Sequence, residues 1–148
     1  MSPSLTCLLA AALFATDVPR DQIQRDDLEQ LQGTWKVEKV ETAGQVLPAN
    51  ALGELRMVFE GNNLTMMMDK TAREKSRFTL MEGEPPGIDI EQPRGAGMET
   101  VKGIYRLEED MLTICTNEGG GGQGMRPKNF ETKGNDRVVL IVLKRVSK

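Results

Sequence analysis

The sequence predicts an all-β domain, a small antiparallel up-and-down β-barrel preceded by a short helix. After Gly33, runs of roughly five to nine residues rich in β-forming side chains alternate with Gly, Asn, Asp and Pro. The only tryptophan, Trp35, lies at the start of the first run, and a basic pair, Lys144 and Arg145, closes the last one. A sheet whose first and last strands meet in this way closes on itself, so these observations together favour a barrel.

Composition limits the classes of protein to which the chain can belong. A chain of 148 residues with 39% hydrophobic content fits one domain that is long enough to bury a core. The net charge is only -3, and acidic and basic residues are interspersed along the chain. Nucleic acids and anionic membrane surfaces require a basic face, which this pattern does not supply, so we expect no nucleic-acid partner.

The first fifteen residues are predicted to be a signal peptide. Residues 5–15 form an apolar run (LTCLLAAALFA) that ends in small residues, with Ala12 and Ala15 as alternative cleavage positions. A bilayer-crossing helix needs about 20 apolar residues, and no segment of the chain reaches that length, so no membrane span is expected. Residues 16–27 are assigned to a linker and the start of the helix. We expect an exported protein, periplasmic or secreted.

Two cysteines bear on processing and stability. Cys7 lies inside the predicted signal peptide, where lipidation is the less favoured alternative because the preceding residues make a poor lipobox. Removal of the signal leaves Cys115 alone, so the exported chain would have no internal disulfide and would depend on packing. Cys115 is therefore expected to be a buried thiol.

The predicted elements follow from hydrophobic periodicity. Ile23, Leu28 and Leu31 are spaced as in a short amphipathic helix over residues 21–31, which could cap one end of the barrel. The barrel domain is assigned to residues 28–146. The expected strands cover residues 33–42, 54–60, 64–68, 76–81, 87–91, 100–107, 111–116, 129–132 and 137–146. The last strand is apolar on both faces, which indicates that its outer side is also covered.

Several short motifs occur in a recognisable order: LQGTW at 31–35, LRMVFEG at 55–61, ID at 88–89, GIY at 103–105, RP at 126–127 and VLKR at 142–145. Over residues 28–145 the chain resembles the planctomycete lipocalin-like domain family, whose members are mostly uncharacterised exported proteins. The resemblance implies a lipocalin-like, or calycin-like, barrel that is open at one end to a small ligand. The chain departs from the family at Pro85-Pro86-Gly87, where Pro-Lys-x usually precedes Ile-Asp, and in its long glycine run.

The same resemblance implies how the barrel closes. In lipocalin-like barrels the indole of the Gly-x-Trp motif packs at the closed end, beneath a basic side chain of the last strand. Gly33 and Trp35 match the motif, and Arg145 is the candidate cation. These three residues are predicted to be structural.

Catalysis is not expected. The chain contains no histidine, which removes the commonest general base and every nucleophile pair that depends on imidazole. The glycine run at 119–124 is followed by Met125-Arg126-Pro127, and a phosphate-binding loop would require Gly-Lys-Ser/Thr there. This run is predicted to be a flexible hairpin loop, with a hinged lid beside Arg126 as the alternative. We predict no enzyme activity and no cofactor.

A metal site is also not expected. The three consecutive methionines at 66–68 invite a copper site, but alternate side chains of a strand point to opposite faces, so the sulfurs would not converge. Flexible methionines in a pocket suit an apolar ligand of variable shape. The candidate ligand-binding residues are Met57, Met66, Met68, Tyr105, Cys115 and Arg126.

Two functional hypotheses follow. The leading one is a binding protein that holds a small apolar or amphiphilic molecule in the barrel. The alternative is a structural or protein-interaction domain of the cell envelope, with a barrel filled by side chains and a protein partner. One local ambiguity stays open: Asp89 is either an outward strand residue or a buried acceptor paired with Arg126.

Overall fold

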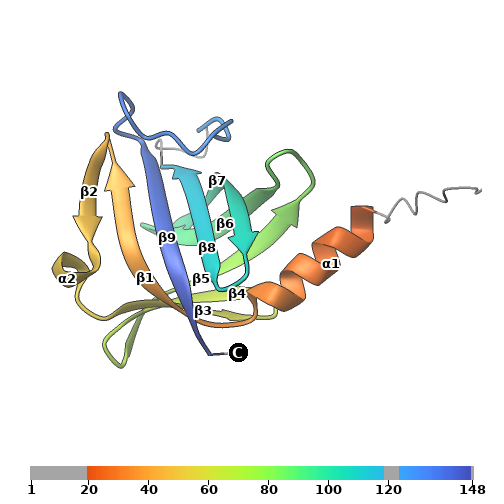
Figure 1. Cartoon of the computed structure of the whole chain (residues 1–148), viewed down its shortest axis with the longest axis horizontal. Helices are drawn as coiled ribbons and strands as arrows, with labels where there is room; N and C mark the ends of the chain where they lie inside the picture. Colours follow the sequence, from red (N-terminus) through yellow and green to blue (C-terminus); the bar gives the residue numbers. More distant parts are fainter. Residues whose placement is uncertain (1–19, 119–123, 148) are drawn as a thin grey trace, which may run out of the picture.

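The computed structural model describes residues 20–118 and 124–147 (Figure 1). The predicted signal peptide, Cys7 and most of the glycine run lie outside the described residues. The described chain begins with a helix and continues as a sheet that one short helix interrupts. Helix α1 spans Arg20–Leu31, and a second, short helix, α2, spans Ala49–Leu52. The strands are β1 (Gly33–Thr42), β2 (Gln45–Pro48), β3 (Leu55–Glu60), β4 (Asn63–Met68), β5 (Thr71–Met81), β6 (Gly87–Arg94), β7 (Gly97–Glu108), β8 (Met111–Asn117) and β9 (Val138–Ser147).

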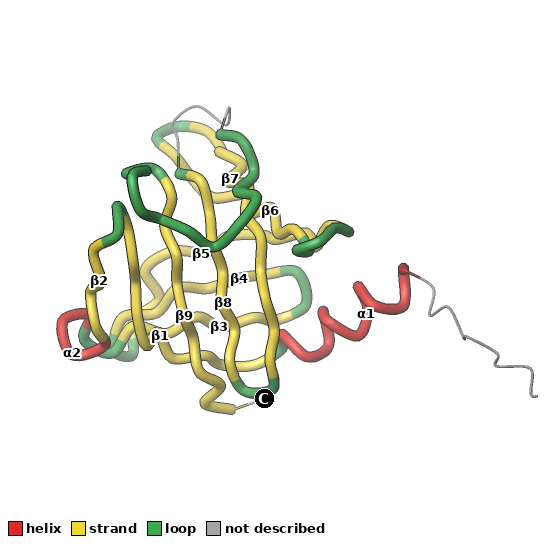
Figure 2. The backbone as a smooth tube through the Cα atoms, turned by 45° about the horizontal axis from the view of Figure 1, so that its top comes forward, coloured by secondary structure: helices red, strands yellow, loops and turns green. Residues whose placement is uncertain are grey.

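The sheet closes into a barrel of eight strands, as the sequence predicts. All neighbours are antiparallel, and the order β1-β3-β4-β5-β6-β7-β8-β9 returns to β1 through a long pairing with β9, in which Trp35 lies opposite Arg145 and Thr42 opposite Val139. The other edge of β1 is divided between two partners. Its first half pairs with β3, and its second half pairs with β2, which lies outside the closed ring. Figure 2 shows the closed ring, with α1 extending from one end.

The barrel interior is filled by large apolar side chains. The buried cluster comprises Leu31, Trp35, Val37, Met57, Phe59, Leu64, Phe78, Ile88, Ile90, Tyr105, Leu112, Ile114 and Leu143. Leu31 comes from α1 and is fully buried, and Leu28 of the same helix packs against the cluster. Helix α1 thus docks against the end of the barrel at which β1 begins, which we call the α1 end. The predicted helix is confirmed.

A second apolar cluster lies on the outer face of the barrel. Ile104, Cys115, Val138 and Leu140 are buried there, and Phe130 packs against them. The interior cluster contains residues of the same strands that are an odd number of positions away, namely Tyr105, Ile114 and Leu143. Because strand side chains alternate between faces, the second cluster lies outside the barrel. In Figure 2 the segment between β8 and β9 crosses this face. The apolar outer side of β9 is therefore covered.

The structure differs from the predicted elements at three places. Residues 129–132 form no strand, because Thr132 donates a hydrogen bond to Glu41 Oε1 (2.6 Å) and accepts one from the amide of Gly44 (3.2 Å) in place of ladder pairing. β2 was not predicted, because its four residues are all exposed and lack an alternating pattern. β5 begins at Thr71 rather than 76, since its first five residues are mostly charged or polar and mostly exposed.

The predicted contact between Trp35 and Arg145 is present at the α1 end. The guanidinium carbon of Arg145 lies 4.2 Å from the indole ring centroid, and its Nη1 donates a hydrogen bond to the carbonyl of Gln32 (3.0 Å). The indole Nε1 donates to the carbonyl of Leu31 (2.8 Å). Gly33 has a φ of 118°, a conformation that side-chain-bearing residues rarely adopt. The last turn of α1 is thereby tied to the last strand.

Replacing Arg145 with alanine is expected to lower the free energy of unfolding by about 1–3 kcal/mol, because a half-buried charged donor and its ring contact are lost together. Arg106→Ala is the matched control. That guanidinium also lies over a ring, 4.9 Å from the centroid of Phe130, but its side chain is 51% exposed. Thermal denaturation should show the larger decrease in Tm for Arg145→Ala. Equal decreases would contradict the structural role given to Arg145.

Candidate functional site

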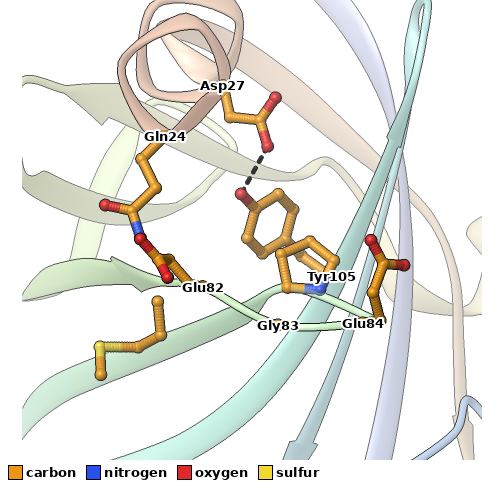
Figure 3. A pocket seen from close by; sticks show the side chains of 8 residues that line it. Gln24, Asp27, Glu82, Gly83, Glu84 and Tyr105 are labelled. Carbon is orange, nitrogen blue, oxygen red and sulfur yellow. Dashed lines mark hydrogen bonds between the residues drawn. The ribbon is translucent and has the colours of Figure 1, made fainter. Parts of the chain in front are cut away.

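A pocket of about 490 Å³ lies at the α1 end, between the helix and the segment that joins β5 to β6 (Figure 3). Its walls come from three separate parts of the chain. The lining residues are Gln24, Asp27, Met81, Glu82, Gly83, Glu84, Pro86 and Tyr105. The pocket therefore depends on the docking of α1 against the barrel.

Local structure explains how the lining residues are positioned. Gln24 and Asp27 are three residues apart on α1, so they project from the same side of the helix. Tyr105 lies in the middle of β7, and its backbone amide donates a hydrogen bond to the carbonyl of Pro86 (3.0 Å). That bond joins the segment between β5 and β6 to β7. It therefore fixes the lining residues of that segment relative to Tyr105.

Tyr105 and Asp27 form the polar centre of the pocket. The phenol donates a hydrogen bond to Asp27 Oδ2 at 2.6 Å, drawn as a dashed line in Figure 3. Tyr105 is only 2% exposed. Burial raises the pKa of its phenol far above the ordinary value, and the hydrogen bond and negative charge of Asp27 raise it further. The phenol is thus held neutral, with its proton directed at the carboxylate.

Tyr105 is the only tyrosine in the chain, so its ionisation can be followed by tyrosinate absorbance. A raised pKa in the folded state means that the stabilisation is complete below about pH 10, the pKa in the unfolded chain, and is lost as pH rises above it. We expect no native tyrosinate signal at pH 10, and its appearance at higher pH together with unfolding. A tyrosinate transition near pH 10 in the folded protein would contradict the buried hydrogen bond.

Two smaller hollows adjoin the pocket. One, of about 290 Å³, shares Asp27, Glu84, Pro86 and Tyr105 with it and extends toward Phe130. The other, of about 310 Å³, lies on the other side and shares Gln24. All three contact α1, so an elongated molecule bound in the first pocket could extend along the helix in either direction.

The methionines predicted to bind a ligand lie elsewhere. Met57 and Met66 are opposite each other on β3 and β4, where Met57 is part of the interior cluster and Met66 packs against it. Met68 is 39% exposed at the end of β4. None of the three lines the pocket at the α1 end, and of the six candidate residues only Tyr105 does.

Cys115 lies on the outer face, so it does not line the barrel interior. Its thiol contacts the carbonyl of Asn129 (3.7 Å) in the segment that covers the outer cluster. Burial, and secondarily the charge of Glu41, raise the pKa of Cys115 to about 11. The thiol is thus protonated at neutral pH and serves as a packing residue, because the thiolate is the reactive form of cysteine.

Arg126 also lies outside the barrel. Its Nη1 donates to the carbonyl of Gly103 (2.7 Å), and its Nη2 forms an ion pair with Asp89 (2.7 Å) whose alignment is not that of a hydrogen bond. The guanidinium fits there because Gly87 has no side chain: a Cβ at that position would lie 2.8 Å from Arg126 Nη1. Asp89 is therefore both an outward strand residue and the partner of Arg126.

Sequence reasoning missed the residues that α1 and the segment between β5 and β6 contribute to the pocket. One signal was available: a single tyrosine on a strand facing the core needs a partner for its hydroxyl. The sequence does not reveal that Asp27, 78 positions away, supplies it. That pairing depends on the angle at which α1 meets the barrel.

Comparisons with protein-family models, with curated proteins and with solved structures find no match for this chain. Within the described residues, neither helix has the length and apolar character needed to span a bilayer.

Proposed function

We propose that this chain is an exported, lipocalin-like binding protein that holds a small apolar or amphiphilic molecule at the α1 end of its barrel. The observation that carries the proposal is the 490 Å³ pocket, in which the apolar side chains of Met81 and Pro86 lie beside the hydrogen-bonded pair of Tyr105 and Asp27. Small-molecule sites typically combine an apolar lining with a few fixed polar groups. The proposed site differs from the one expected from the sequence, which was the barrel interior.

The two kinds of wall have different roles in this proposal. Contact with Met81 and Pro86 removes apolar surface of the ligand from water, which favours binding by about 25 cal/mol for each Å² buried. The pair of Tyr105 and Asp27 orients the polar end. The protein binds its ligand without turnover. Export, to the periplasm or out of the cell, rests on the apolar run at residues 5–15.

Native mass spectrometry of protein purified from its own host tests the proposal. We expect a retained small molecule, and we expect its loss in Met81→Trp, because the indole would occupy the pocket from a residue that is 40% exposed. Met98→Trp is the matched control, since Met98 is 63% exposed and does not line the pocket. A protein without bound mass, or retention of the ligand by Met81→Trp, would contradict binding at this site.

A structural or protein-interaction domain of the envelope is the second candidate. It is favoured by the filled interior, where Phe59 and Phe78 pack edge to face with ring centroids 5.3 Å apart and are at most 2% exposed. It is also favoured by β2, which lies at the end of the strand order and exposes about half of Val46 and Leu47. A polypeptide that copurifies with the protein and is lost in Val46→Lys would support this candidate.

A further inference from the structure

We propose that the pocket at the α1 end selects ligands with a cationic amine head and an apolar tail. This inference rests on the proposed function and adds the chemical class of the ligand. It is carried by the charges that line the pocket, by the imbalance between its hydrogen-bond donors and acceptors, and by the apolar residues in the same lining.

Among the described residues, the charged side chains that line the pocket are all acidic. Asp27 comes from α1, and Glu82 and Glu84 come from the segment between β5 and β6. Among the described lining residues none is basic. Carboxylates on facing walls lower the energy of a cation between them and raise that of an anion. The pocket is thus electrostatically suited to a positive group, although the whole chain carries a net charge of only -3.

The hydrogen-bond donors and acceptors of the lining residues also favour a cationic group. The proton of Tyr105 is directed at Asp27, so toward a ligand the phenolic oxygen has only lone pairs to offer. The carboxylates of Asp27 and Glu84 are acceptors as well, which leaves the amide of Gln24 as the one side-chain donor among the described lining residues. An ammonium group supplies up to three donors and no acceptor, which complements this set.

The pocket lining combines acidic and apolar residues. In Figure 3 Asp27 projects from α1 toward the hydroxyl of Tyr105, with Gln24 and Glu82 on one side of the Tyr105 ring and Glu84 on the other. Met81 and Pro86 supply apolar surface to the same pocket. An amine held by these carboxylates can therefore leave its hydrocarbon tail against the apolar lining of the same pocket.

Two arginines line the adjoining hollows and do not line the pocket itself. Arg106 lies over the ring of Phe130 and forms an ion pair with Glu108 (3.6 Å) on the side of the smaller hollow. Arg25 lines the hollow on the other side of α1, next to Leu28. Neither is among the lining residues of the 490 Å³ pocket.

Isothermal titration with octylammonium, 1-octanol and octanoate tests the inference, because the three probes share one tail length and differ in head charge. We expect octylammonium to bind at least about tenfold more tightly than octanoate, with 1-octanol between them. Added salt should weaken only the binding of octylammonium. Equal or tighter binding of octanoate would overturn the charge preference and leave a binding pocket. Absence of binding by all three would overturn the pocket itself.

Single substitutions locate the effect. Asp27→Asn and Glu84→Gln each remove one charge with little change of shape, so each is expected to weaken octylammonium binding about three- to tenfold and to weaken 1-octanol binding less. Asp136→Asn is the control, because Asp136 is exposed near β9 and lines none of the three hollows. Circular dichroism verifies that each variant is folded. Equal effects of all three variants on octylammonium would contradict a local role for the pocket carboxylates.

Discussion

Replacing Trp35 with alanine is expected to lower the free energy of unfolding by about 3–5 kcal/mol, the usual range for removing a large aromatic side chain from a core. The indole is fully buried, belongs to the interior cluster and donates a hydrogen bond to the carbonyl of Leu31. Its loss would also remove the surface over which Arg145 lies. Interior packing, the end of α1 and the last strand would thus be weakened together.

Urea denaturation followed by far-ultraviolet circular dichroism measures this effect, because the substitution removes the only tryptophan and with it the fluorescence signal. Trp35→Phe is the matched variant. It retains an aromatic ring in the core but loses the indole donor, so an intermediate decrease is expected. A decrease below about 1 kcal/mol for Trp35→Ala would show that the indole does not hold the α1 end of the barrel together.

Gly103→Ala is expected to lower the free energy of unfolding by about 1–3 kcal/mol through overpacking of the barrel wall. A Cβ at this position would lie 2.8 Å from the backbone oxygen of Cys115, 2.9 Å from Thr116 Cγ2 and 3.3 Å from Ile88 Cγ2. The nearest atom belongs to the backbone of the neighbouring strand, so it cannot be relieved by a change of rotamer. β7 and β8 would have to separate at a point where both are buried.

Gly97→Ala is the control for this substitution. Gly97 lies on the same strand, and a Cβ there would meet nothing within 4 Å. Thermal or urea denaturation should show a clear loss of stability for Gly103→Ala and a change within about 0.5 kcal/mol for Gly97→Ala. Similar values for the two variants would mean that β7 and β8 are not in close contact at Gly103.

The closed barrel was predictable because its signals are local and repeat along the chain. Strand alternation identified most of the strands, and Trp35 and Arg145 marked the two ends that meet. The failures at β2 and at residues 129–132 have different causes. β2 is fully exposed and has no alternating pattern, whereas in residues 129–132 the hydrogen bonds of Thr132 take the place of strand pairing.

The candidate site was much less predictable, because its residues come together only through long-range docking. Alternation along a strand gives the relative side of each residue, but not which side is the interior. Cys115 and Arg126 consequently proved to lie on the outer face, where the segment before β9 covers the barrel. Asp27 became a pocket residue because it lies one turn before the buried Leu31, on the side of α1 that faces the barrel. The same helix thus contributes to the core and to the pocket wall.

An NMR titration of the isotopically labelled protein with octylammonium is the most direct test of ligand binding at the α1 end. We predict saturable amide shifts concentrated at Gln24, Asp27, Gly83 and Tyr105, which come from the three separate segments that line the pocket. Shifts confined to other parts of the barrel, or a well-dispersed spectrum that does not change up to millimolar octylammonium, would contradict it.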